Sequence, residues 1–464
     1  MKKKIVISLE PRKVPTVKTK FRTICTQIPT PRFRKLYRQI DKYEASLVHD
    51  QLPIVWDSAK DFQVFDADGN CWIDFTSTIF VANSGHSNPA TIKAVKDQLK
   101  KPLLHSYNYV TEIRAKFLEK LIKMTPKFCE KACLFSAGTE AVECAIMLAR
   151  NWGHSIHKKK INIVSHLGSM HGITTGSEML RGDPKTLEIL GYSDPHVFRL
   201  PFPYPWDVEN NLHYDWARRF ESDMAILKKK GLDFKSIAGF IIEPFQGWGA
   251  IFYPKAYIKA LENFAKKHNA LLIIDEIQGG FGRTGKMFAF EHYGIRPDLL
   301  CLGKGLSGSL PLSAVIGSKK IMDLPQIRGS MHSTHSGNPI SCASALANLE
   351  ELERKNLVSK SAKKGKLLFD RLNGIQKKYS NMISHVLGKG LLAGILFKNL
   401  DGSLNRSLPA QICETAMQSG LLLVHTSRSI KISPPLTIPD AALAEGLDVL
   451  EESIKNLAID QKEN

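Results

Sequence analysis

Two neighbouring apolar runs in the middle of the chain lead to residues that can do chemistry, one an acid and the other an amine. The run 271–274 precedes Asp275, and the run 299–302 precedes Gly303 and Lys304. A short continuous apolar run bounded by turn residues is typical of a buried strand in a parallel sheet. Because ligands of open α/β sheets lie beyond the carboxyl ends of the strands, both side chains are expected at one edge of the sheet.

A buried carboxylate beside a buried lysine matches the needs of pyridoxal 5'-phosphate. The lysine amine forms a Schiff base with the aldehyde of this cofactor, and the carboxylate keeps the pyridine nitrogen protonated, so that the ring accepts electrons. The alternative is an ordinary salt bridge, or two unrelated surface residues in a lysine-rich chain. The residues around Asp275 and Lys304 favour the cofactor.

Three motif blocks surround these two residues. Their members are Asp275, Glu276, Gln278, Gly280, Arg283, Thr284 and Gly285, then Pro297 and Asp298, then Lys304, Gly305, Leu310, Pro311, Leu312, Ser313 and Ala314. These blocks resemble the class III aminotransferases, the branch of fold-type I pyridoxal-phosphate enzymes that includes the ornithine, acetylornithine and 4-aminobutyrate enzymes. One local departure is Leu310, which stands where the family has a small residue.

The resemblance implies catalytic roles for Lys304 and Asp275 and a set of cofactor contacts. Lys304 would carry the cofactor and then move a proton between the donor carbon and the cofactor. Hydrolysis would leave an oxo product and pyridoxamine phosphate, and an oxo acceptor would reverse the sequence. The implied cofactor-binding residues are Gly138, Thr139, Met170, Glu243, Asp275, Gln278, Lys304 and Thr334.

Gly138 and Thr139 open a stretch with apolar residues at helical spacing, and a helix N-terminus suits a phosphate. Thr139 taken alone would be a plain helix cap. Met170 stands where the family usually has the aromatic residue that stacks on the cofactor ring. His171 after it is interpreted as a structural histidine rather than a catalytic one.

Thr334 belongs to a Thr-x-x-Gly-Asn-Pro motif. In the family this threonine bonds the cofactor phosphate of the neighbouring subunit. The resemblance therefore implies a homodimer with shared active sites.

Departures from the family concern the substrate. Ile173 and Lys431 stand where relatives that act on glutamate or ornithine have arginines. Lysine is a point charge and does not replace the planar fork of arginine, so Lys431 is only a candidate for holding one substrate carboxylate. Arg428 and Arg181 are alternative anchors. The amino donor would be an amino acid or an amine, and the acceptor an oxo acid or an aldehyde.

Two other functions remain open. Some relatives on this scaffold racemise or epimerise amino acids, and others couple decarboxylation to transamination. A non-catalytic protein with a basic surface is a further alternative, because the formal net charge is +19. Nucleic-acid binding would need basic residues gathered on one face with aromatics. The N-terminus does carry a basic cluster, but basic runs such as 158–160 and 228–230 are usually solvated helix ends or loops, so dedicated nucleic-acid binding is disfavoured.

Composition predicts an ordinary intracellular globular protein. The chain has 464 residues, of which 43% are hydrophobic, and no apolar run approaches a membrane span. Its eight cysteines are scattered without a zinc-binding pattern, so no metal is expected and the thiols are interpreted as reduced and cytoplasmic.

The expected architecture is α/β: a large domain with a mainly parallel seven-stranded sheet, plus a small α+β domain from both chain ends. Alternating strands and helices over about 110–340 support the parallel sheet, and the segment 62–75 has the pattern of a hairpin. A helix is expected over Phe33 to Glu44. The predicted limits are a basic arm over 1–30, small-domain segments over 31–80 and 341–464, and the cofactor domain over 81–340.

Overall fold

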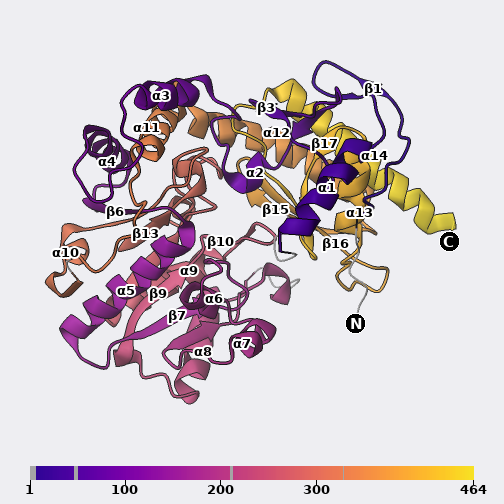
Figure 1. Cartoon of the computed structure of the whole chain (residues 1–464). Helices are drawn as coiled ribbons and strands as arrows, with labels where there is room; N and C mark the ends of the chain where they lie inside the picture. Colours follow the sequence, from indigo (N-terminus) through magenta and orange to yellow (C-terminus); the bar gives the residue numbers. More distant parts are fainter. Residues whose placement is uncertain (1–6, 46–50, 209–212, 328, 464) are drawn as a thin grey trace.

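The computed structural model describes residues 7–45, 51–208, 213–327 and 329–463 (Figure 1). The first six residues of the predicted basic arm, with Lys2, Lys3 and Lys4, lie outside the described residues. Within the described chain, no helix is both long and apolar enough to cross a membrane.

A seven-stranded sheet forms the centre of the larger half of the molecule. Its strand order is β6-β14-β13-β12-β9-β7-β8, and β14 alone runs antiparallel to its neighbours. The predicted mainly parallel α/β sheet is therefore confirmed. The strands are β6 (Lys131–Phe135), β7 (Asn162–His166), β8 (Val197–Leu200), β9 (Ile237–Ile242), β12 (Leu271–Asp275), β13 (Leu299–Leu302) and β14 (Ser313–Gly317).

Helices cover both faces of this sheet, which explains why its central strands are apolar throughout. Along β12, Leu272 and Ile274 belong to one core cluster together with side chains of α8 and α9, whereas Leu271 and Ile273 belong to a second cluster with α5. Every residue of β9, β12, β13 and β14 is buried, as expected for a sheet covered on both sides. The helices of this half are α3 (Pro89–Leu99), α4 (Glu112–Met124), α5 (Gly138–Ile156), α6 (Thr175–Arg181), α7 (Pro184–Leu190), α8 (Trp216–Lys229), α9 (Lys255–Lys267), α10 (Lys319–Met322) and α11 (Pro339–Arg354).

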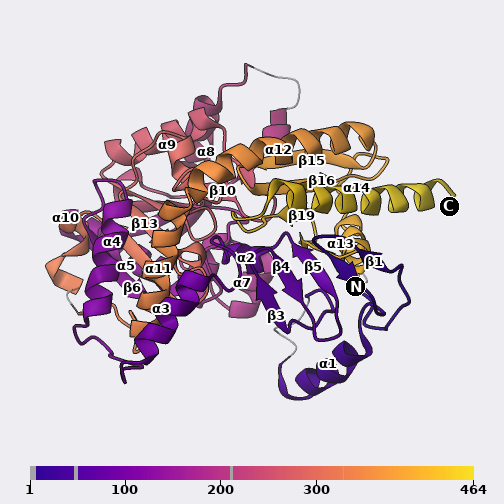
Figure 2. The ribbon, with the colours of Figure 1, turned by 90° about the horizontal axis from the view of Figure 1, so that it is seen from above.

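Segments from both chain ends build the other half, where indigo strands lie beside yellow helices (Figure 2). Strand β17 from the C-terminal part pairs in parallel with β5, with Leu421 opposite Ile73. The predicted hairpin is present as β4 and β5, and the predicted helix as α1. These elements are α1 (Pro31–Tyr43), β1 (Val17–Lys18), β2 (Thr23–Ile24), β3 (Ser58–Lys60), β4 (Gln63–Phe65), β5 (Cys71–Asp74), α12 (Leu357–Lys378), β15 (Ile383–Lys389), β16 (Leu392–Phe397), α13 (Leu408–Gln418), β17 (Leu421–Leu422), β18 (Val424–His425), β19 (Ser429–Ile432) and α14 (Asp440–Glu463).

Two further antiparallel sheets are present in the described chain. Strands β10 (Phe245–Gln246) and β11 (Ile251–Phe252) form a short antiparallel pair, and β15, β16, β19 and β18 form an antiparallel sheet. The three predicted domain limits stay a prediction, and the one at 340/341 falls in the first turn of α11.

Candidate active site

A cavity of about 440 Å³ opens beyond the carboxyl ends of β9, β12 and β13. The structure therefore brings together at one sheet edge the side chains that the apolar runs predict. Seven of the predicted site residues line this cavity: Gly138, Thr139, Met170, Glu243, Asp275, Gln278 and Lys304.

Lys304 begins a tight turn directly after β13, with a backbone φ of +43°. That left-handed conformation is unusual for a residue with a side chain and is a mark of functional sites. Burial lowers the pKa of the Lys304 amine, and the negative charges of Asp275 and Glu243 oppose this effect. A lysine with a lowered pKa is more often unprotonated, as a nucleophile must be.

Asp275 is the last residue of β12, and only 3% of its side chain is exposed. Its carboxylate accepts hydrogen bonds from the Ile277 amide (3.1 Å) and from Nδ1 of His171 (2.8 Å). The other ring nitrogen of His171 has no partner among the described residues. His171 thus orients Asp275, a role that the sequence did not reveal because the two residues are 104 positions apart.

Glu243 follows β9 and is a buried residue of the cavity wall, 4% exposed. Its Oε2 accepts a hydrogen bond from the Met170 amide (3.0 Å), and burial raises the pKa of its carboxyl to about 7. Oε1 of Glu243 and Oε1 of Gln278 are buried without a hydrogen-bond partner in the described chain. Gly247 leaves room for them, since a Cβ there would lie 2.8 Å from both side chains.

The start of α5 forms another wall. The Glu140 carboxylate accepts hydrogen bonds from the amides of Ser136 (2.9 Å) and Ala137 (2.8 Å). The amides of Gly138 and Thr139 come next, in the first helical turn, where amides lack an acceptor within the helix. The Thr139 hydroxyl lies 2.7 Å from the Ser177 hydroxyl. These amides and the positive end of the helix suit an anion such as a phosphate.

Lys431 does not line the cavity, but it lies close to it. This residue of β19 is 8% exposed, and its Nζ lies 4.7 Å from the ring centroid of Phe80. Burial lowers the pKa of Lys431 to about 8; Lys304 acts in the same direction and Glu243 opposes it. The ammonium is therefore within electrostatic reach of both cavity residues.

Phe80 ends a left-handed turn, Ser77–Phe80 (α2), that the sequence did not predict. All four residues have positive φ, from 47° to 70°, although none is glycine. Such a conformation costs roughly 1–2 kcal/mol per residue, so surrounding contacts must hold it.

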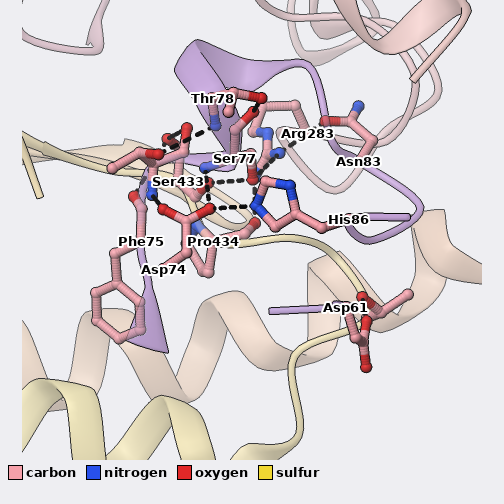
Figure 3. A network of polar contacts seen from close by, with 12 residues as sticks. Asp61, Asp74, Phe75, Ser77, Thr78, Asn83, His86, Arg283, Ser433 and Pro434 are labelled. Carbon is pink, nitrogen blue, oxygen red and sulfur yellow. Dashed lines mark hydrogen bonds and ion pairs between the residues drawn. The ribbon is translucent and has the colours of Figure 1, made fainter. Parts of the chain in front are cut away.

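Buried polar groups supply those contacts (Figure 3). Asp74 accepts hydrogen bonds from the amides of Thr76 (2.7 Å) and Ser77 (3.0 Å). The buried guanidinium of Arg283 donates to the Ser77 hydroxyl (3.1 Å) and to the Pro434 carbonyl (2.6 Å). Arg283 therefore ties the motif block after β12 to the turn that presents Phe80.

Thr334 is exposed and does not line the cavity of its own chain. Ile173 lines the cavity and is 80% exposed. The rim of the cavity is therefore apolar at the position where the sequence predicted that an arginine is missing.

Several polar groups of the cavity could hold pyridoxal phosphate, and two of their oxygen atoms are buried without a hydrogen-bond partner in the described chain. Gln278 and Glu243 offer oxygens, Asp275 a carboxylate, Lys304 an amine, and the start of α5 two amides. The donor set matches an aldehyde, a pyridine nitrogen, a ring hydroxyl and a phosphate.

Comparisons with known proteins agree with this geometry. The sequence model of the family described as Aminotransferase class-III matches residues 45–454. The chain is 34% identical to the 2-aminoadipate transaminase of Pseudomonas putida, over 89% of this chain and 97% of that one. It is also 34% identical to the leucine/methionine racemase of Thermococcus litoralis, over 87% and 91%.

Among solved structures, the acetylornithine aminotransferase of Elizabethkingia anophelis is 28% identical, with a TM-score of 0.74, over 91% of this chain and 99% of that one. Family, relatives and fold agree, and they favour amino transfer over the racemase and the non-catalytic alternatives. The chain belongs to the class III aminotransferase family and is an aminotransferase with the fold of the type I enzymes.

Proposed function

We propose that the chain binds pyridoxal 5'-phosphate in the 440 Å³ cavity and transfers an amino group from an amino acid or amine to an oxo acid or aldehyde. The observation that carries the proposal is the convergence of Lys304, Asp275, Glu243 and Gln278 on one cavity from the ends of three neighbouring strands. The cofactor would supply an aldehyde that takes up the amino group and a ring that accepts electrons.

Each residue then has a defined task. The Lys304 amine, with its lowered pKa, holds the cofactor and moves a proton at the donor carbon. Asp275, oriented by His171, holds the pyridine nitrogen in its protonated form. Gly138 and Thr139 bind the phosphate through their amides, and Gln278 donates to the ring oxygen.

Lys431 is the proposed anchor for the substrate carboxylate. It is the basic residue that the structure places within electrostatic reach of Lys304 and Glu243. Arg428 instead packs its guanidinium over Trp248, 5.2 Å from the ring centroid, and Arg181 pairs with Glu178.

The proposal includes two features of the assembly. Thr334, exposed on its own chain, would reach the phosphate of a second subunit, so the active protein would be a homodimer. The location would be the cytoplasm, where the eight cysteines stay reduced.

A spectral titration tests the proposal. The purified protein should show the visible absorbance of protein-bound pyridoxal phosphate, lose it with one amino donor, and regain it with an oxo acid. The Lys304→Ala variant should fail to form this absorbance, while Lys286→Ala, which removes an exposed lysine from the same segment, should behave as the wild type. A wild-type spectrum without visible absorbance after cofactor addition would refute the proposal.

The same titration addresses racemisation, the second candidate, which the 34% identity to a racemase favours. A racemase would leave the absorbance in place while an optically pure amino acid loses its optical rotation.

A further inference from the structure

A second cavity, of about 850 Å³, lies between β3, the start of α3 and the start of α12. None of the residues that line it lines the cofactor cavity. Its walls combine apolar side chains with several cationic ones. The apolar wall residues are Ala59, Phe65, Pro89 and Leu357.

Positive charge dominates the ionisable residues of this cavity. Lys60, Lys355 and Lys360 line it, against the single carboxylate of Asp61. Lys355 is engaged with Glu351 at 2.8 Å, whereas Lys60 and Lys360 have no ion pair among the described residues. Asp61 is itself occupied, since it accepts a hydrogen bond from the Thr437 hydroxyl. Two lysine ammonium groups are thus available to an anion.

The backbone adds to this field, because two helices begin at the cavity. Asn88 is the N-cap of α3 and Pro89 its first residue, and Leu357 begins the 22-residue helix α12. The N-cap of α12, Asn356, makes no side-chain capping bond, so the first amides of that helix keep their donors. Positive helix ends and unused amides favour an anionic ligand.

His86 adds a polar group to the wall of this cavity. It lines the cavity, is 8% exposed, and places its Nε2 2.6 Å from Asp74 (Figure 3). Its Nδ1 is not among the buried polar atoms that lack a partner, so this nitrogen is accessible and can bond to a ligand in the cavity.

We propose that this second cavity binds an anionic small molecule that carries an apolar part, such as a phosphate monoester or a free carboxylate of a hydrophobic group. Lys60, Lys360 and the start of α12 bind the anionic group. Phe65 and Leu357 contact the apolar part, and His86 adds one hydrogen bond.

The wall of this cavity is connected to the active site through hydrogen bonds. Ser84, a wall residue, donates its hydroxyl to Oδ1 of Asn348 (2.7 Å). Asn348 in turn donates to the carbonyls of Gly305 (2.8 Å) and Leu306 (3.1 Å), the two residues after Lys304. This chain of hydrogen bonds joins the wall of the second cavity to the turn that holds Lys304.

Calorimetric titration of phenyl phosphate into the cofactor-loaded protein tests the site, because bound pyridoxal phosphate already fills the phosphate position at α5. One saturable site per chain is expected. The Lys60→Ala/Lys360→Ala variant should bind phenyl phosphate about tenfold more weakly or worse. The matched control is Lys363→Ala, which removes an exposed lysine of α12 that does not line the cavity and should leave the affinity unchanged.

Inorganic phosphate, which lacks the apolar part, should bind more weakly than phenyl phosphate. Absence of saturable binding to the wild type would overturn the proposal, and so would equal affinity in all three proteins, which would place the phosphate elsewhere. Both lysines are exposed, so their replacement leaves the core intact. Heat of binding needs no turnover, so this test is read independently of the proposed amino transfer.

Discussion

Replacing Glu243 by glutamine should change how the stability of the protein depends on pH. Burial raises the pKa of this carboxyl from 4.5 to about 7, because partial removal from water disfavours its charged form. Since the folded pKa exceeds the unfolded one, the folded state holds its proton more tightly. The resulting stability is complete below the unfolded pKa of 4.5 and is lost as the pH rises through 7.

The magnitude follows from these two pKa values. Linkage gives a loss of about 2.5 kcal/mol in the free energy of unfolding between about pH 5 and pH 8. For a chain of 464 residues this corresponds to a fall of about 2–3 °C in the melting temperature. Glu243→Gln keeps the acceptor for the Met170 amide and removes the titration, so this part of the pH dependence should vanish in the variant.

Thermal unfolding of the cofactor-free protein, followed by calorimetry at both pH values, measures this effect. The melting temperature of the variant is subtracted from that of the wild type at each pH, because the contributions of the other titrating groups cancel in this difference. Glu188→Gln, at an exposed position, is the control and should follow the wild type. If the difference in melting temperature between wild type and Glu243→Gln is the same at both pH values, Glu243 is not a buried carboxyl with a raised pKa.

Four further substitutions have defined outcomes. Gly153→Ala would place a Cβ 1.9 Å from the Lys160 carbonyl oxygen and should lower the free energy of unfolding by about 1–3 kcal/mol or more. Gly374→Ala, with open space around it in another helix, should raise it by about 0.5–1 kcal/mol, and calorimetry separates the two. Lys431→Met should raise KM for amino-acid donors about tenfold or more and spare amines without a carboxylate, as steady-state kinetics will show; equal losses for both would contradict the proposed anchor. Gly247→Ala should weaken binding of pyridoxal phosphate at least about tenfold in a fluorescence titration, because the new methyl occupies space beside the cofactor-facing oxygens; unchanged affinity would contradict this placement.

The sequence could predict the sheet edge because parallel strands obey a simple rule. Glu243, Asp275 and Lys304 each follow an apolar run, and such runs end at the same side of a parallel sheet. Their meeting in one cavity therefore needed no knowledge of loops. The hairpin over β4 and β5 was equally accessible, since its alternating pattern and Asp-Gly turn are local.

Contacts made by loops were beyond prediction. His171 meets Asp275 only because the segment after β7 folds back across the sheet edge. The left-handed turn Ser77–Phe80 contains no glycine to indicate positive φ, and Arg283, which helps to hold it, lies 206 positions away from Ser77. The role of Thr334 toward a second subunit and the three domain limits stay predictions.

The parallel pairing of β5 with β17 has a consequence for the order of assembly during synthesis. Ile73 of β5 pairs with Leu421, and the indole of Trp72 donates to the Met417 carbonyl (2.8 Å), so β5 lacks these partners until nearly the whole chain has left the ribosome. Contacts of such long sequence separation form slowly, because a long loop must close before they contribute. Until then the end of β5, at Ile73 and Asp74, lacks its partner strand, and an unpaired strand edge is open to pairing with another chain.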